Sequence, residues 1–205
     1  MTDAAAPPAG LASAGYVRIW TVGLLTGVVR WLEMLALGVL AYDLTGSPAL
    51  VALLVILRFL PLALFGPILG ALADALPAKA LMTWGLAGMA ALSAGLWAGF
   101  SRGEPGYAVV AAAVLVSGAF WAGDLPVRRK LMADLVGDAR LARAVAIDGL
   151  ASNGTRMLGP LAGGALYQWV GTEGVFALSA ALYALGWAVA AGLRPAAGAP
   201  RPARA

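Results

Sequence analysis

The stretch ALVALLVILRFLPLALFGPILGAL, residues 49–72, carries a single charge, Arg58, in an otherwise apolar run. A helix needs about 20 mostly apolar residues to cross the hydrocarbon core of a bilayer, and this run is long enough. Five other windows are comparable. The six windows are Tyr16–Ala41, Ala49–Leu72, Ala80–Phe100, Tyr107–Leu125, Ala144–Val170 and Gly174–Leu193. The sequence therefore predicts an all-α membrane protein with six transmembrane helices.

The composition of the whole chain agrees with a membrane protein. Of its 205 residues 61% are apolar and 12% are charged, and the mean hydropathy is +0.86. Such a chain has too little polar surface for a water-soluble domain. The absence of histidine and cysteine removes the commonest general base and the thiolate ligands. We therefore expect no enzyme, no metal site and no cofactor.

The basic residues outside the windows, together with Arg18 near the start of the first window, are distributed unevenly between the two sides of the predicted bundle. One side has only Arg102. The other has Arg18, Lys79, Arg128, Arg129, Lys130, Arg140, Arg143, Arg194, Arg201 and Arg204. Cytoplasmic loops carry the excess of lysine and arginine, so both termini are expected in the cytoplasm. Because these cations flank helix ends, contact with anionic lipid explains the net charge of +4 better than nucleic acid does.

The two ends of the chain differ from its centre. Residues 1–15 are small and contain prolines, which predicts a disordered cytoplasmic tail without a cleavable signal. Residues 16–193 form the transmembrane domain, and residues 194–205 form a second, basic cytoplasmic tail rich in proline and alanine.

Two connections between the windows have recognisable patterns. The segment Asp43–Pro48 contains Gly46 and ends in proline, which is typical of a tight reversal between antiparallel helices. The segment Pro126–Arg143 alternates cations with apolar residues. It fits short amphipathic helices on the membrane surface, and the run Arg128–Lys130 taken alone fits a solvated basic loop equally well.

Charged residues inside the windows mark a candidate substrate or ion pathway, because ionised groups at membrane depth must face protein or water. Arg30 and Glu33 are three residues apart on one helix face, where they could neutralise each other. The pair either stabilises packing or lines a cavity.

Arg58 precedes two prolines and two glycines in its window. Asp124 either belongs to the pathway or is a helix-end partner of Arg128 or Arg129. The tryptophans are interpreted as interfacial or packing residues.

The window Ala144–Val170 has the clearest polar stripe. Its members are Asp148, Ser152, Thr155, Arg156, Gly159 and Gly163, at spacings that place them on one helical face. We expect that face to point away from lipid. Pro160 breaks the hydrogen-bond ladder nearby, and Gly159, Gly163 and Gly164 admit a second backbone closely. The segment is either a bent, tightly packed helix or a moving gate.

These residues together resemble the amino-terminal six-helix half of the major facilitator superfamily, in the branch of bacterial enterobactin and macrolide exporters. The likeness lies in residues 36–48, in Gly70–Lys79 and in residues 126–164. The second stretch matches the family's loop signature at Gly70, Asp74 and Lys79, but has Ala75 where the family usually has arginine and Pro77 where it has glycine. The third resembles the antiporter signature at its end, with Ala146 and Thr155 in place of glycines.

The resemblance implies a transporter that contains two such halves, with the substrate between them. One half would act as a homodimer or with a different partner half, and would export a small amphipathic or charged molecule across the bacterial inner membrane. Proton antiport would use Glu33, Asp124 or Asp148 as the titrating group. Gly70, Asp74, Lys79 and the glycines around Pro160 would serve gating. The alternative from another class is a membrane module that binds lipid or protein through Arg128, Arg129 and Lys130.

Overall fold

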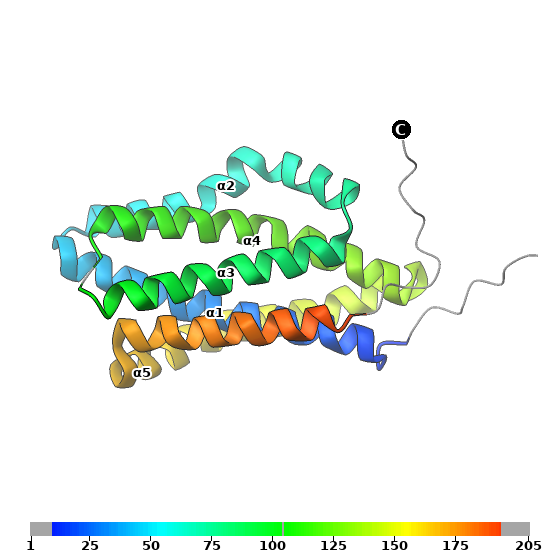
Figure 1. The fold of residues 1–205 in the computed structure, drawn as a ribbon. Helices are drawn as coiled ribbons and strands as arrows, with labels where there is room; N and C mark the ends of the chain where they lie inside the picture. Colours follow the sequence, from blue (N-terminus) through cyan, green and yellow to red (C-terminus); the bar gives the residue numbers. More distant parts are fainter. Residues whose placement is uncertain (1–9, 104, 194–205) are drawn as a thin grey trace, which may run out of the picture.

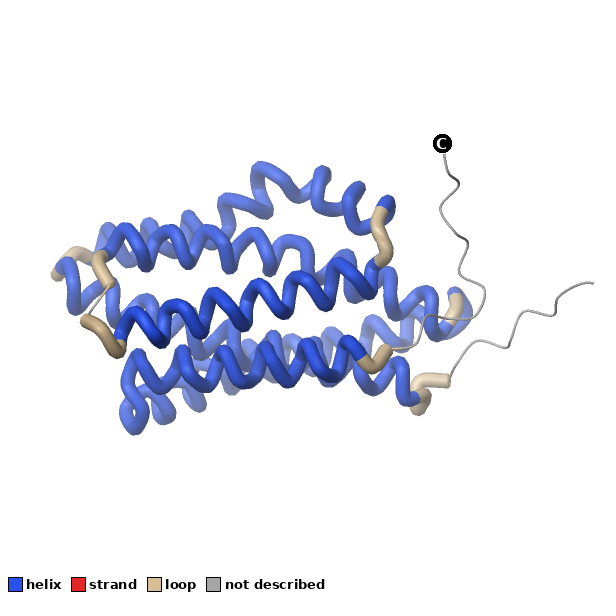
Figure 2. Tube along the Cα trace, viewed as in Figure 1, coloured by secondary structure: helices blue, strands red, loops and turns tan. Residues whose placement is uncertain are grey.

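The computed structural model describes residues 10–103 and 105–193, apart from the side chain of Asp74, and within these residues it contains helices and connections but no strand (Figure 2). The helices are α1 (Ala14–Thr45), α2 (Pro48–Ala75), α3 (Ala78–Phe100), α4 (Tyr107–Val136) and α5 (Asp138–Ala191). All five are long and apolar enough to cross a membrane. The tail predicted over 194–205 and residues 1–9 of the tail predicted over 1–15 lie outside the described residues. The first tail is shorter than predicted, because Ser13 caps α1, which begins at Ala14.

The prediction of six separate helices holds only in part, because the last two windows belong to one helical element, α5. Gly171 inside α5 has non-helical angles, φ 62° and ψ −172°. Glycine reaches positive φ without steric cost, so the chain can turn here within one residue. Figure 1 shows the reversal near the α5 label. We call residues 138–170 the first arm of α5 and residues 172–191 its second arm.

The short reversal between α1 and α2 is confirmed. Gly46 ends α1 with φ 62°, and its N–H bonds the Tyr42 carbonyl oxygen. Ser47 then caps α2 by accepting a hydrogen bond from the Leu50 N–H, with Pro48 at the first helical position. Left-handed glycine followed by a serine cap allows two antiparallel helices to be joined by two residues.

The segment predicted as a long basic connection, Pro126–Arg143, is almost entirely helical. Helix α4 continues through Pro126 to Val136, and α5 starts at Asp138, so only Gly137 separates them. A solvated basic loop is therefore the wrong alternative. Pro126 does not end the helix, and the residues that follow it stay packed: Met132 and Val136 are both buried.

Helix α1 has the most buried apolar window of the five helices. It packs mainly against α5, while α2 packs mainly against α4, and α3 packs against α4 and α5. The start of α1 and the end of α5 lie at the same end of the molecule (Figure 1). There Arg18 donates to the Gly192 carbonyl oxygen and Lys79 to that of Leu193 (2.5 Å). We call this end, which holds Arg18, Lys79 and Lys130, the basic end.

Candidate functional site

Three helices contribute to a chain of buried ion pairs inside the bundle. Arg30 comes from the middle of α1, and its Nη2 lies 3.7 Å from Asp124 Oδ2 on α4. The same carboxylate oxygen lies 3.4 Å from Arg128 Nη2, one turn further along α4. Arg128 Nη1 then donates a 3.0 Å hydrogen bond to Asp148 Oδ1 on the first arm of α5. The order of charges is plus, minus, plus, minus, so each carboxylate screens an arginine.

The sequence folds this way because α1 has glycines where the other helices approach. A Cβ at position 23 would overlap the Arg128 guanidinium and would lie 3.1 Å from Asp148 Oδ1. A Cβ at position 27 would lie 2.9 Å from Thr155 Oγ1. Gly23 thus leaves the space in which the α4 to α5 ion pair forms, and Gly27 leaves space for Thr155 of α5.

Glu33 lies among different partners, although it is only three residues from Arg30. It is 2% exposed, and its Oε1 accepts a 2.8 Å hydrogen bond from Ser93 on α3. Ser179 of the second arm of α5 lies close by. The predicted Arg30–Glu33 pair is therefore wrong, because Arg30 turns toward α4 and Glu33 toward α3. Helix spacing places two side chains on adjoining sides but does not say which helix each one meets.

Arg30 is the member of the ion-pair chain closest to the surface. Its side chain is 22% exposed, against 5% for Asp124 and 4% for Arg128. The guanidinium lies 4.9 Å from the centre of the Trp121 ring, a cation–π distance. Phe59 of α2 meets the same ring edge-on at 4.9 Å. We call Arg30, Trp121 and Phe59 the aromatic mouth. Sequence reasoning missed it, because it assigned the tryptophans to packing.

The stripe predicted in the first arm of α5 divides in the structure. Asp148, Thr155 and Gly163 are buried, and Ser152 is partly buried. Arg156 is exposed and does not join the ion-pair chain. A Cβ at position 159 would lie 2.6 Å from Trp31 Cβ on α1, so close helix packing is confirmed there. Gly164 and Pro160 lie outside that contact, partly buried and exposed respectively.

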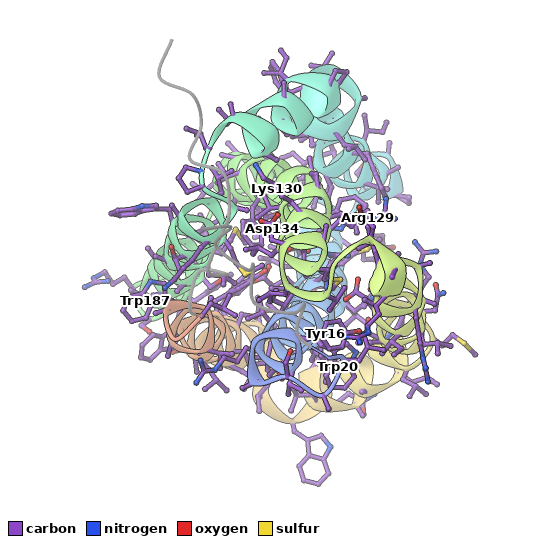
Figure 3. All side chains as sticks on the ribbon, turned by 90° about the vertical axis from the view of Figure 1, so that its right-hand side faces the viewer. Tyr16, Trp20, Arg129, Lys130, Asp134 and Trp187 are labelled. Atoms are coloured by element: carbon purple, nitrogen blue, oxygen red, sulfur yellow. The ribbon has the colours of Figure 1, made fainter. Side chains whose placement is uncertain are left out.

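Of the residues predicted to serve gating, Gly70 and Lys79 lie toward the basic end, where one neighbour was not anticipated. A Cβ at position 70 would meet no atom within 4 Å, so Gly70 does not allow a close approach of another helix. Lys79 bonds the end of α5, and the side chain of Asp74 lies outside the described residues. Lys130 of α4 donates to the carbonyl oxygens of Ala73 (2.8 Å) and Leu76 (3.4 Å) at the end of α2. Figure 3 views this end, with Lys130 on the side of α4 toward α2 and Arg129 on the side toward α5.

Two of the cations counted in the predicted basic connection differ in their surroundings. Arg128 is 4% exposed and belongs to the ion-pair chain, so it is not a surface cation. Arg129 is exposed. Among the described residues, acidic side chains do not gather in a group that could hold a metal ion.

The comparison with known families agrees with the bundle. The sequence profile described as Major Facilitator Superfamily matches residues 19–205, which is nearly the whole chain. Among curated proteins, none matches this chain. The matched family is generally one of membrane transporters and not of enzymes. With its membrane-spanning helices and this match, the chain belongs to the major facilitator superfamily.

Proposed function

We propose that this chain is half of a secondary transporter, that two copies form the working unit, and that it moves a small amphipathic or charged molecule by alternating access. The observation that carries the proposal is the position of Arg30. It belongs to a chain of charges near the middle of three membrane-spanning helices, yet its side chain keeps 22% of its surface. A guanidinium at that depth must face protein or water.

The aromatic mouth supplies chemistry suited to an amphipathic molecule. Phe59 is 43% exposed and offers an apolar surface beside the Trp121 ring. Arg30 offers hydrogen-bond donors, and its ion pair with Asp124, at 3.7 Å, is the longest of the three in the chain. Arg128 lies closer to Asp124 than Arg30 does, so Asp124 stays paired if Arg30 leaves it. Of the three ion pairs, the Arg30–Asp124 pair is therefore the one whose replacement by a polar group of a substrate costs the least interaction energy.

Exposed residues on the first arm of α5 support the proposal that a second copy packs against this face. Arg156 lies near the middle of the first arm of α5 and is exposed, which a lipid environment disfavours by about 2.5–3.5 kcal/mol on insertion scales. The same arm exposes Met157 and Leu161. Two copies related by a twofold axis along the membrane normal would cover such a face and place both aromatic mouths around one cavity.

Direction, coupling and location complete the proposal. The basic end lies in the cytoplasm of a bacterial cell, in its inner membrane, and the molecule is exported in exchange for protons. Glu33, Asp124 and Asp148 are the carboxylates available for proton transfer, because all three are buried near the ion-pair chain. The alternative of a membrane module that binds through its basic connection is weakened, since Arg128 is engaged with Asp124 and Asp148.

The experiment has two parts. Native mass spectrometry of the gently extracted full chain, with pull-down of differently tagged copies from one membrane, gives the number of copies. Proteoliposomes with a pH gradient then report movement of a cationic and an anionic dye, rhodamine 6G and carboxyfluorescein, for wild type and Glu33→Gln. We expect a dimer and gradient-dependent flux of one dye that Glu33→Gln lowers. The proposal would be refuted by a monomer in native mass spectrometry with no co-purification of differently tagged copies. It would also be refuted if a purified dimer moved neither dye and Glu33→Gln behaved as wild type in every measurement.

A further inference from the structure

Arg58 is a buried cation that the ion-pair chain does not include. It lies in α2, ten residues after Pro48, and only 5% of it is exposed. Its backbone is fixed by close packing of α2 on α4, because a Cβ at Gly118 would overlap the Arg58 carbonyl oxygen. The position of the Arg58 backbone therefore follows from a contact between two helix backbones.

Within the described residues, the Arg58 guanidinium makes no hydrogen bond and no ion pair. Glu33 interacts with it electrostatically but gives its Oε1 to Ser93. Arginine stays protonated in proteins and carries five N–H donors. A buried charge without a hydrogen-bonded partner is strongly unfavourable, so these donors call for an acceptor.

A cavity of about 160 Å³ lies beside Arg58, between α1, α2 and α4. Its lining includes Met34, Gly38, Val55 and Val114, and Arg58 is the only charged residue among the described residues that line it. Val55 is 41% exposed, so the cavity reaches the surface. Among the described residues, two side-chain nitrogens are fully buried and lack a hydrogen-bond partner, Trp20 Nε1 and Arg128 Nε. The Arg58 nitrogens also lack a hydrogen-bond partner but are not fully buried, so they border accessible space.

We propose that this cavity is a binding site for one small monovalent anion, held by the Arg58 guanidinium. A single fixed positive charge in an otherwise uncharged lining matches a single negative charge. A volume of 160 Å³ exceeds the roughly 10–15 Å³ of probe-occupied volume needed for one water, so an ion such as chloride, or a carboxylate group, fits together with water. The proposal does not rest on transport, because such a site would bind its anion without a gradient.

The test measures binding of radiolabelled chloride to the purified full chain by scintillation proximity, with sodium gluconate holding the ionic strength constant. Nitrate and acetate serve as competitors, and labelled acetate is measured directly as a second probe. The first variant is Arg58→Gln. Its control is Arg102→Gln, which removes an exposed cation in the connection between α3 and α4. Arg58→Gln is expected to weaken binding at least about tenfold, the loss expected for a charged hydrogen bond.

A second variant leaves Arg58 in place and fills the cavity, in case Arg58→Gln fails to fold. Gly38 lines the cavity, and a Cβ at this position would meet no atom within 4 Å. The leucine side chain of Gly38→Leu therefore occupies cavity space without a backbone clash. Gly88→Leu on α3 is the matched control, because a Cβ there also meets no atom within 4 Å. We expect Gly38→Leu to lose chloride binding and Gly88→Leu to retain it.

The outcomes are distinct. Saturable chloride binding that nitrate displaces assigns an inorganic anion, and saturable binding of acetate alone assigns the carboxylate of a larger molecule. Both support the site if Gly38→Leu abolishes them. The proposal is overturned if folded wild-type protein binds neither probe saturably, or if Arg58→Gln and Gly38→Leu bind as wild type does. Flux in proteoliposomes is measured separately, so failure here leaves the proposed transport function unaffected.

Discussion

Arg128 on α4 donates a 3.0 Å hydrogen bond to Asp148 on α5, through space that Gly23 of α1 leaves open. Both side chains are more than nine-tenths buried. Asp124 adds a second carboxylate 3.4 Å from the same arginine. Helices α4 and α5 are therefore joined by charges, and Arg30 of α1 extends the chain through Asp124.

Replacing Asp148 by asparagine should destabilise the bundle. Removing one partner of a buried ion pair costs about 3–5 kcal/mol, and we expect a value near the lower limit because Asp124 still faces Arg128. The measurement is the free energy of unfolding of the purified protein in mixed micelles. Asp134→Asn is the control, since Asp134 is exposed on α4, and it should change the free energy by less than about 0.5 kcal/mol.

The coupling between the two residues can be isolated with the double variant. Arg128→Leu with Asp148→Leu removes both charges together. It should lose less free energy than the sum of the two single variants, because neither charge is left buried alone. If the losses simply added, the 3.0 Å contact would carry no interaction energy.

The close approach of α2 and α4 gives a second prediction, at Gly118. A Cβ there would lie 3.0 Å from the Arg58 carbonyl carbon and would overlap its oxygen, so Gly118→Ala must push two backbones apart. We expect a loss of about 1–3 kcal/mol, which is typical of overpacking.

Gly123→Ala is the control on the same helix. A Cβ at position 123 meets no atom within 4 Å. Alanine should therefore stabilise α4 by up to about 1 kcal/mol through its helix propensity. Opposite signs for the two variants in thermal unfolding would support the packing of α2 on α4, whereas equal signs would contradict it.

The sequence predicts the helices well and their partners poorly. The first four apolar windows and the tight reversal at Asp43–Pro48 are local features, and they appear in the structure as expected. Gly171 is different, because the gap between the windows Ala144–Val170 and Gly174–Leu193 predicts a connection, whereas a single left-handed glycine reverses the chain inside one helical element.

The candidate site shows the same limit. Spacing identified Arg30, Glu33, Asp124 and Asp148 as charges at depth, which the structure places in or near the bundle interior. Spacing could not show that Arg30 and Glu33 face different helices. The sequence predicts Arg128 in a connection, since the window before it ends at Leu125, whereas α4 continues through this position and buries it. Tertiary packing decides which helices are neighbours, and the local pattern of one sequence does not predict it.

Lys130 leads to a third prediction, at the basic end. Its ammonium group bonds the last carbonyl oxygens of α2, where cations also interact favourably with the helix dipole. Lys130→Met should loosen this end, and amide hydrogen exchange of residues 71–76 should become faster. Arg129→Gln, on the neighbouring exposed position, should leave exchange there unchanged. Equal rates in Lys130→Met and wild type would mean that these bonds do not hold the end of α2.

Arg30 gives the prediction that separates a transporter from a membrane module that binds through its basic surface. Arg30→Gln keeps the length and polarity of the side chain but removes the charge that Asp124 and the Trp121 ring both face. We expect dye flux in proteoliposomes to fall at least about tenfold, because a charged hydrogen bond to the substrate is lost.

The fold should tolerate this change better than the loss of Asp148, since the Arg30 side chain is partly exposed and Arg128 still neutralises Asp124. Arg129→Gln removes an exposed cation from α4 and should leave flux within about twofold of wild type. Trp121→Leu keeps an apolar side chain but removes the aromatic face, and it should weaken dye affinity more than maximal flux. If Arg129→Gln lowered flux as much as Arg30→Gln does, the activity would depend on surface charge at the basic end. The aromatic mouth would then not be where the substrate binds.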